Sequence, residues 1–152
     1  MRKLLLLSLL TTALGGAAIA APLSRDAALK VIAQREAGYK EIGKSMRAAK
    51  QAIDKGDAAA ARGPANRIAA LAARAPGWFP AGSGPEAGKT SAKPLIWKQR
   101  ADFDSKMKSF GAAAIAFRAV AAGGDLGAMK AAQGRLGQTC GACHEQYRVK
   151  DD

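Results

Sequence analysis

The sequence is poor in histidine, cysteine and acidic residues. It has one histidine and two cysteines, so it lacks the four Cys or His ligands of a structural zinc site. Asp and Glu number 12 against 24 Lys and Arg, which gives a net charge of +12. After the first 20 residues no stretch is apolar enough to span a bilayer, for which about 20 apolar residues are needed. There is no internal repeat and no low-complexity tail.

The N-terminus has the three parts of a secretory signal peptide. A basic start, Met1-Arg2-Lys3, precedes a mainly apolar stretch and then a segment rich in Gly and Ala. We expect cleavage after Ala20, with Ala21 as the alternative, because small residues then fill the positions before the cut. A membrane anchor is the other interpretation, but roughly 17 residues are short for a span. Residues 1–20 are therefore predicted to be a signal peptide, and residues 21–152 a periplasmic domain without stable membrane insertion.

Export limits which partners the positive net charge can indicate. Removing residues 1–20 leaves 132 residues, enough for one domain, with a net charge of +10. An exported protein does not meet nucleic acid, so no nucleic-acid partner is expected. The charge then indicates attraction to acidic partner proteins or to an anionic membrane surface, with simple solubility as the alternative.

The chain predicts an all-α fold. No segment alternates as a strand does, and good helix formers such as Ala, Leu, Lys and Arg dominate. Four helices are expected, at about 24–53, 57–74, 94–122 and 125–147. Short turns make the first and last pairs antiparallel, which predicts an up-down-up-down four-helix bundle. The Gly- and Pro-rich loop at 75–93 contains Trp78 and Phe79, which we expect to pack on the bundle.

Apolar spacing predicts which side of each helix faces the core. The first helix offers Leu29, Ile32, Tyr39, Met46 and Ile53, with Ala33, Ile42 and Ala49 beside them, and the second offers Ile68 and Leu71. The third offers Ile96, Phe103, Met107, Phe110, Ala114, Phe117 and Ala121. The fourth offers Leu126, Met129, Gln133, Leu136, Cys140, Cys143 and Tyr147, so both cysteines face inward.

The last helix carries the sequence Cys140-Gly141-Ala142-Cys143-His144. Two cysteines three residues apart lie on one helix face and reach both vinyl groups of a haem, and the following histidine reaches the iron. A disulfide is the general expectation for two cysteines in an oxidising compartment. A thioredoxin-like motif needs a strand that this chain lacks. Cys140 and Cys143 are therefore predicted to attach one haem c covalently, with His144 as the iron ligand.

Because the chain has a single histidine, the second axial ligand of the iron cannot be a histidine if His144 is the first. The sixth position is left to a methionine, another side chain, water or nothing.

At this point the mature chain resembles the cytochrome c′ family, which includes up-down-up-down bundles. The segments that carry the resemblance are 140–148, Lys93-Pro94-Leu95-Ile96-Trp97, Trp78-Phe79-Pro80-Ala81-Gly82, 35–39 and 43–46. In the family, one side chain of the first helix lies over the open face of the haem: an apolar or aromatic cover in high-spin members, a methionine ligand in low-spin members.

The resemblance places Tyr39 at that position. Tyr39 is predicted to cover a five-coordinate haem; ligation as a phenolate and a plain core role are the alternatives. The other methionines, Met46, Met107 and Met129, are interpreted as core residues. Further haem-edge residues implied by the resemblance are Arg35, Glu36, Thr90, Ser91 and Lys93 near the propionates, and Arg148 beside His144. For Arg35, Lys93 and Arg148 the alternative is an ordinary surface charge.

The resemblance implies electron transfer and the binding of NO or CO. A low-spin six-coordinate electron carrier is the alternative. We do not expect an enzyme such as a peroxidase, because no second histidine offers distal acid–base catalysis. Family members are commonly homodimers packed through their first two helices, so a homodimer is expected here too.

Overall fold

The computed structural model describes residues 23–150, and the predicted signal peptide lies outside them. The described part is helical, with one isolated antiparallel bridge between Ala92 and Arg148. Its elements are α1 (Arg25–Asp54), α2 (Ala58–Arg74), the 3₁₀ turn η1 (Ala75–Trp78), α3 (Leu95–Lys98), α4 (Arg100–Gly123) and α5 (Leu126–Tyr147). None of these helices is long and apolar enough to cross a membrane.

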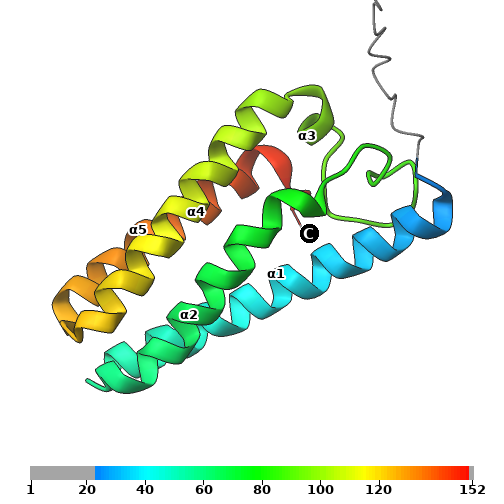
Figure 1. Ribbon diagram of the computed structural model, residues 1–152. Helices are drawn as coiled ribbons and strands as arrows, with labels where there is room; N and C mark the ends of the chain where they lie inside the picture. The colour runs from blue at the N-terminus through cyan, green and yellow to red at the C-terminus, as the bar shows by residue number, and fades with distance from the viewer. Residues whose placement is uncertain (1–22, 151–152) are drawn as a thin grey trace, which may run out of the picture.

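Four long helices form the predicted antiparallel bundle. Figure 1 shows two hairpins, α1 with α2 and α4 with α5, packed together through α2 and α4. By contrast, α1 and α5 are in sparse contact along their length. The loop between α2 and α4 lies at the same end of the bundle as the C-terminal end of α5. The fold therefore brings the end that carries Cys140 and Cys143 next to this loop.

Three of the four predicted helices begin where the sequence predicts. Ser24 Oγ accepts a hydrogen bond from the Ala27 amide at 3.3 Å, and Asp57 Oδ1 accepts one from Ala60 at 2.9 Å. Asp125 Oδ1 caps α5 by accepting from the Ala128 amide at 3.0 Å. Gly124 ends α4 with a φ of +84°, a left-handed conformation that glycine adopts without strain.

The third predicted helix is not continuous, so the prediction of one helix from Pro94 onward is wrong. The single turn α3 is separated from α4 by Gln99, whose φ of −116° and ψ of 49° are not helical. The Gln99 side chain accepts a hydrogen bond from Gln146 Nε2 at 2.8 Å, and the Trp97 indole donates to the Pro80 carbonyl at 2.9 Å. These contacts to distant segments coincide with the break. The residues around Gln99 alone therefore do not predict it.

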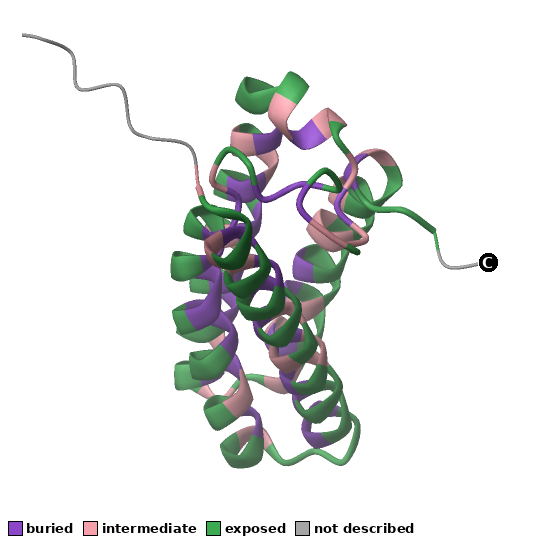
Figure 2. Cartoon of the chain, turned by 90° about the vertical axis from the view of Figure 1, so that its right-hand side faces the viewer, coloured by how far each residue is buried: buried purple, intermediate pink, exposed green. Residues whose placement is uncertain are grey.

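The core follows the predicted inward faces. Every apolar position predicted for α3 and α4 is buried, and Figure 2 shows buried residues inside the bundle and exposed residues outside. Two predictions for α1 are wrong, because Leu29 is 40% exposed and Ala33 is also exposed. In their place α1 buries Ala28 and Arg35, so its inward face is rotated at this end.

The Trp78 indole packs directly against the backbone of α1 at Gly38, which has no side chain. A Cβ at this position would overlap three atoms of the indole ring. Gly38 and Trp78 are both buried. The close approach therefore requires glycine, and it places Trp78 beside the next residue, Tyr39.

We expect Gly38→Ala to destabilise the protein by about 1–3 kcal/mol, because the new methyl group overpacks against Trp78. Gly134→Ala is the matched control: it also lies inside a helix, but nothing lies within 4 Å of its added Cβ. That change should stabilise by about 0.5–1 kcal/mol. Urea unfolding of both variants measures the difference, and equal effects would refute the packing role of Gly38.

Candidate functional site

Cys140, Cys143 and His144 lie on the last turns of α5. Both thiols are free and half-buried, and the His144 side chain is exposed. Burial raises the pKa of each thiol, so both are present as S–H at neutral pH. The pKa of His144 is lowered by burial of part of the ring and by the nearby charge of Arg148. A neutral imidazole is the form that binds a metal.

Tyr39 on α1 packs against the same core cluster as the two cysteines. Its pKa is raised by burial first, and then by electrostatic interaction with Cys143 and Cys140. The hydroxyl donates a hydrogen bond to Met107 Sδ at 3.7 Å, and the ring meets Trp78 edge-on with centroids 5.4 Å apart. The raised pKa keeps the phenol protonated.

Arg35 lies one turn before Tyr39, and only 3% of it is exposed. Its guanidinium donates to the carbonyls of Trp78 at 3.1 Å and Ser83 at 3.0 Å. It also donates to Ser83 Oγ at 3.3 Å and Thr90 Oγ1 at 2.9 Å, and it lies 4.9 Å from the centroid of Phe79. Burial lowers its pKa. Within residues 23–150 no carboxylate lies within ion-pair distance of Arg35, so its acceptors are all neutral.

The predicted haem-edge residues fall into two groups. Thr90 bonds Arg35 directly, whereas Glu36 is exposed and acts on Arg35 through its charge. The second group joins the segment before α3 to the end of α5. The Ser91 carbonyl accepts from the Val149 amide at 2.8 Å, and the Lys93 amide donates to the Tyr147 carbonyl at 2.9 Å.

These backbone bonds position Arg148. It forms the isolated bridge with Ala92, and its amide donates to the His144 carbonyl at 3.1 Å. Its positive charge lowers the pKa of His144. Arg148 therefore lies beside the predicted iron ligand, and Ser91 and Lys93 bond to the end of α5 through their backbones. The haem-edge roles of these residues stay predictions.

The residues at this end of the bundle fit a haem. Two thiols and an imidazole share the end of α5, and Tyr39, Trp78 and Phe79 supply an aromatic wall. Arg35 is a buried cation with no carboxylate of the described residues within ion-pair distance, which suits the carboxylate of a propionate. Cys140 and Cys143 would hold the group covalently, and His144 would bind its iron.

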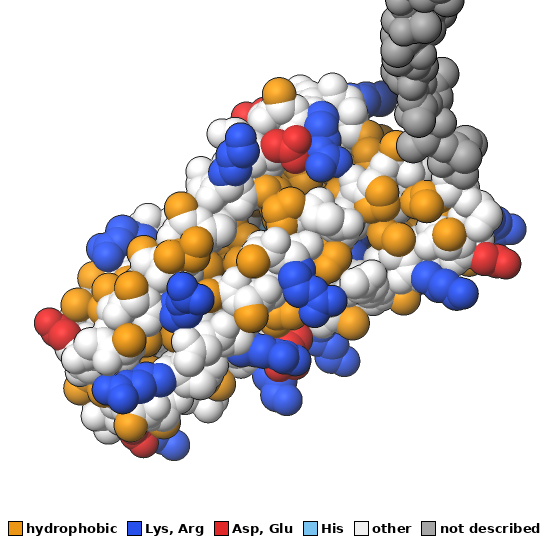
Figure 3. Space-filling model, in the orientation of Figure 1, with side chains coloured by type: hydrophobic (Ala, Val, Ile, Leu, Met, Phe, Trp, Pro, Cys, Tyr) orange, Lys and Arg blue, Asp and Glu red, His pale blue; other side chains and the backbone are white. Residues whose placement is uncertain are grey.

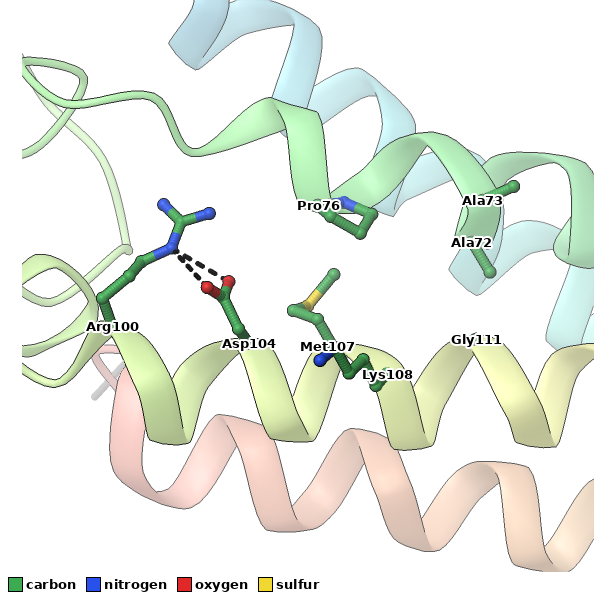
Figure 4. A pocket seen from close by; sticks show the side chains of 8 residues that line it. All are labelled: Ala72, Ala73, Pro76, Arg100, Asp104, Met107, Lys108 and Gly111. Atoms are coloured by element: carbon green, nitrogen blue, oxygen red, sulfur yellow. Dashed lines mark hydrogen bonds and ion pairs between the residues drawn. The ribbon is translucent and has the colours of Figure 1, made fainter. Parts of the chain in front are cut away.

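A separate pocket of about 450 Å³ opens between α2 and α4. Figure 4 shows Pro76 and Ala72 on one side and Asp104, Met107 and Gly111 on the other. None of the predicted site residues lines it. Met107 is the connection, because the same side chain borders the pocket and accepts the hydrogen bond of Tyr39.

Comparison with known proteins gives a family. The model of the family described as Cytochrome C′ matches residues 30–148. The chain belongs to the cytochrome c′ family. It is 35% identical over 146 residues to the cytochrome c′ of Allochromatium vinosum, which covers 93% of each chain. As a member of this family it is a c-type haem protein.

Two solved structures extend the comparison. One is a cytochrome c′ with a ligand-controlled dimer dissociation, with a TM-score of 0.76 and 33% identity over 86% of this chain and all of that one. The other is a nitric oxide complex of a mutant cytochrome c prime from Alcaligenes xylosoxidans. Its TM-score is 0.70 at 26% identity, over 86% of this chain and 100% of that chain. Both similarities support the cytochrome c′ fold.

Sequence reasoning missed several residues at this end of the bundle. Ser83 provides two acceptors for Arg35, and Met107 was interpreted only as a core residue although it also anchors Tyr39. A serine in a loop and a methionine on an inward face carry no pattern that reveals such a partner.

We expect the haem to be lost only when both cysteines are replaced. Cys140→Ala and Cys143→Ala each leave one thioether, so acid–acetone extraction should leave haem on either single variant. The double variant should release it. Release from a single variant, or retention by the double variant, would contradict attachment through these two thiols.

Proposed function

We propose that this cytochrome c′ family member is an exported, high-spin, five-coordinate haem protein that transfers electrons and binds NO and CO. The observation that carries the proposal is the side chain opposite the two cysteines: it is Tyr39, not methionine. His144 is the only histidine and would be the single axial ligand. When bound, the haem supplies one-electron chemistry at its iron.

The residues around Tyr39 favour small neutral ligands. The phenol stays protonated, and its hydroxyl donates a hydrogen bond to Met107 Sδ at 3.7 Å. Trp78 and Phe79 pack around the ring, with centroids 5.4 Å and 6.2 Å from it. A wall with no free polar group disfavours water and anions, because a buried charge or dipole needs a partner. A diatomic gas is neutral and loses little solvation on entry, so its main cost is the displacement of the Tyr39 ring.

The similar Alcaligenes xylosoxidans protein supports the gas-binding part of the proposal. A mutant of that protein has been solved as a nitric oxide complex, and its fold matches this chain over 86% of the sequence. For this chain, we take NO as the principal ligand and CO as the practical probe.

The rest of the biological setting follows from the same proposal. We place the protein in the periplasm after removal of residues 1–20, with acidic redox proteins as partners. Figure 3 shows more Lys and Arg than Asp and Glu on the face in view, which suits an acidic partner. A homodimer through α1 and α2 is also proposed, since a similar structure is described as a dimer. We do not propose an enzymatic activity.

A low-spin electron carrier is the second candidate. The observation that favours it is Met107, whose sulfur lies 3.7 Å from the Tyr39 hydroxyl. A low-spin spectrum that becomes high-spin in Met107→Leu would favour this candidate over the first.

We expect Tyr39→Ala to raise the CO affinity of the reduced protein by at least about tenfold, or about 1.4 kcal/mol. The physical reason is that CO no longer has to displace the ring, so the binding-competent state needs no rearrangement. Optical titration with CO measures the affinity. Tyr39→Phe is the matched control, because it keeps the ring, and should stay within about threefold of wild type. An unchanged affinity in Tyr39→Ala would refute the covering role.

A further inference from the structure

A charged cluster lies where α4 meets the end of α5, and no predicted role includes it. The Tyr147 hydroxyl donates to Asp102 Oδ2 at 2.6 Å, and Lys106 Nζ lies 3.9 Å from the same oxygen. The Tyr147 residue is 2% exposed, and its ring meets Phe103 edge-on at 5.3 Å. One anchor of the Asp102 carboxylate is therefore rigid and buried.

This cluster is next to the haem attachment point. Tyr147 follows Cys143 by four residues, so both lie on one face of α5. Asp102 on α4 is bonded to this face of α5 through Tyr147, and Lys106 lies one turn further along α4 beside Asp102. Two opposite charges on α4 therefore lie next to the helix face that would carry the haem.

The ion pair between Asp102 and Lys106 contributes little to the stability of the protein. The side chain of Asp102 is 51% exposed and that of Lys106 is 28% exposed, and exposed i,i+4 pairs contribute about 0–1 kcal/mol. A carboxylate that is held by a buried tyrosine has a fixed position, and a fixed charge next to a redox centre has a consequence that a mobile one lacks.

We propose that Asp102 and Lys106 set the reduction potential of the attached haem in opposite directions, and that Tyr147 is the positioning residue that holds Asp102. The oxidised haem carries one more positive charge than the reduced haem. A nearby carboxylate favours the oxidised form and lowers the potential, and a nearby ammonium group raises it. The inference rests on the proposed haem attachment at Cys143.

The test is a spectroelectrochemical titration of the haem-loaded protein. Asp102→Asn should raise the potential and Lys106→Gln should lower it. Each should change the ratio of reduced to oxidised protein at a fixed potential by about three- to tenfold, where tenfold corresponds to about 59 mV for one electron.

Asp54→Asn and Lys50→Gln are matched controls. Lys50 and Asp54 form the same kind of i,i+4 pair, with Nζ and Oδ2 2.6 Å apart, but on the far part of α1. Lys50 is eleven residues from Tyr39, or roughly 16 Å along the helix, which exceeds the screening length of about 8–10 Å in physiological salt. These variants should leave the ratio within about 1.5-fold of wild type.

Tyr147→Phe tests the positioning role separately. It should raise the potential by less than Asp102→Asn does, because the carboxylate then swings into solvent. In the Asp102→Asn background it should have no further effect. An equal shift in both backgrounds would mean that Tyr147 acts through packing alone and would overturn its positioning role.

The charge proposal is overturned if Asp102→Asn and Lys106→Gln shift the potential in the same direction, or if neither differs from the controls. CO binding of the wild-type protein is measured separately, because it tests the proposed gas binding and not the charge proposal. A wild-type protein that fails to bind CO, in a series whose potentials shift as stated, would overturn the proposed gas binding and support the present inference.

Discussion

The buried guanidinium of Arg35 is the interaction on which the haem end of this molecule depends. It fixes the segment that follows α2 by donating to Trp78, Ser83 and Thr90, and it lies against the ring of Phe79. Removing one partner from a buried charged network costs several kcal/mol, because the remaining groups are left unsatisfied. The aromatic wall around Tyr39 therefore depends on a cation that has no carboxylate within ion-pair distance among residues 23–150. That buried cation, bonded only to neutral acceptors, is also the strongest structural reason to place a haem propionate at this end.

The two sides of the site are built by different means. On the α5 side, the positions of Cys143, His144 and Tyr147 follow from helix geometry, and the bridge between Ala92 and Arg148 holds the helix end. On the α1 side, the position of Tyr39 depends on Gly38, which admits the Trp78 indole, and on Met107 from α4. A substitution in α4 can therefore alter either side of the site: Met107 contacts Tyr39, and Asp102 lies near the turn of α5 that carries Cys143.

The fold and the attachment motif were predictable because they rest on local rules. Helix caps such as Ser24 and Asp125, and the apolar spacing of α4, depend on residues within a turn or two of one another. The break at Gln99, the four acceptors of Arg35 and the bond from Tyr147 to Asp102 join segments more than 40 residues apart. Periodicity says which face of a helix is buried, but it does not say which polar groups will meet across an interface. The exposure of Leu29 has the same origin, because the loop and Arg35 rotate the inward face of α1.

The central claim is that His144 is the only protein ligand and that Tyr39 covers the opposite face without binding. Electron paramagnetic resonance of the oxidised protein at neutral pH tests it most directly. The account predicts a high-spin signal, since one imidazole and no sixth ligand leave the iron in a weak ligand field. A dominant low-spin signal in the wild-type protein would contradict it.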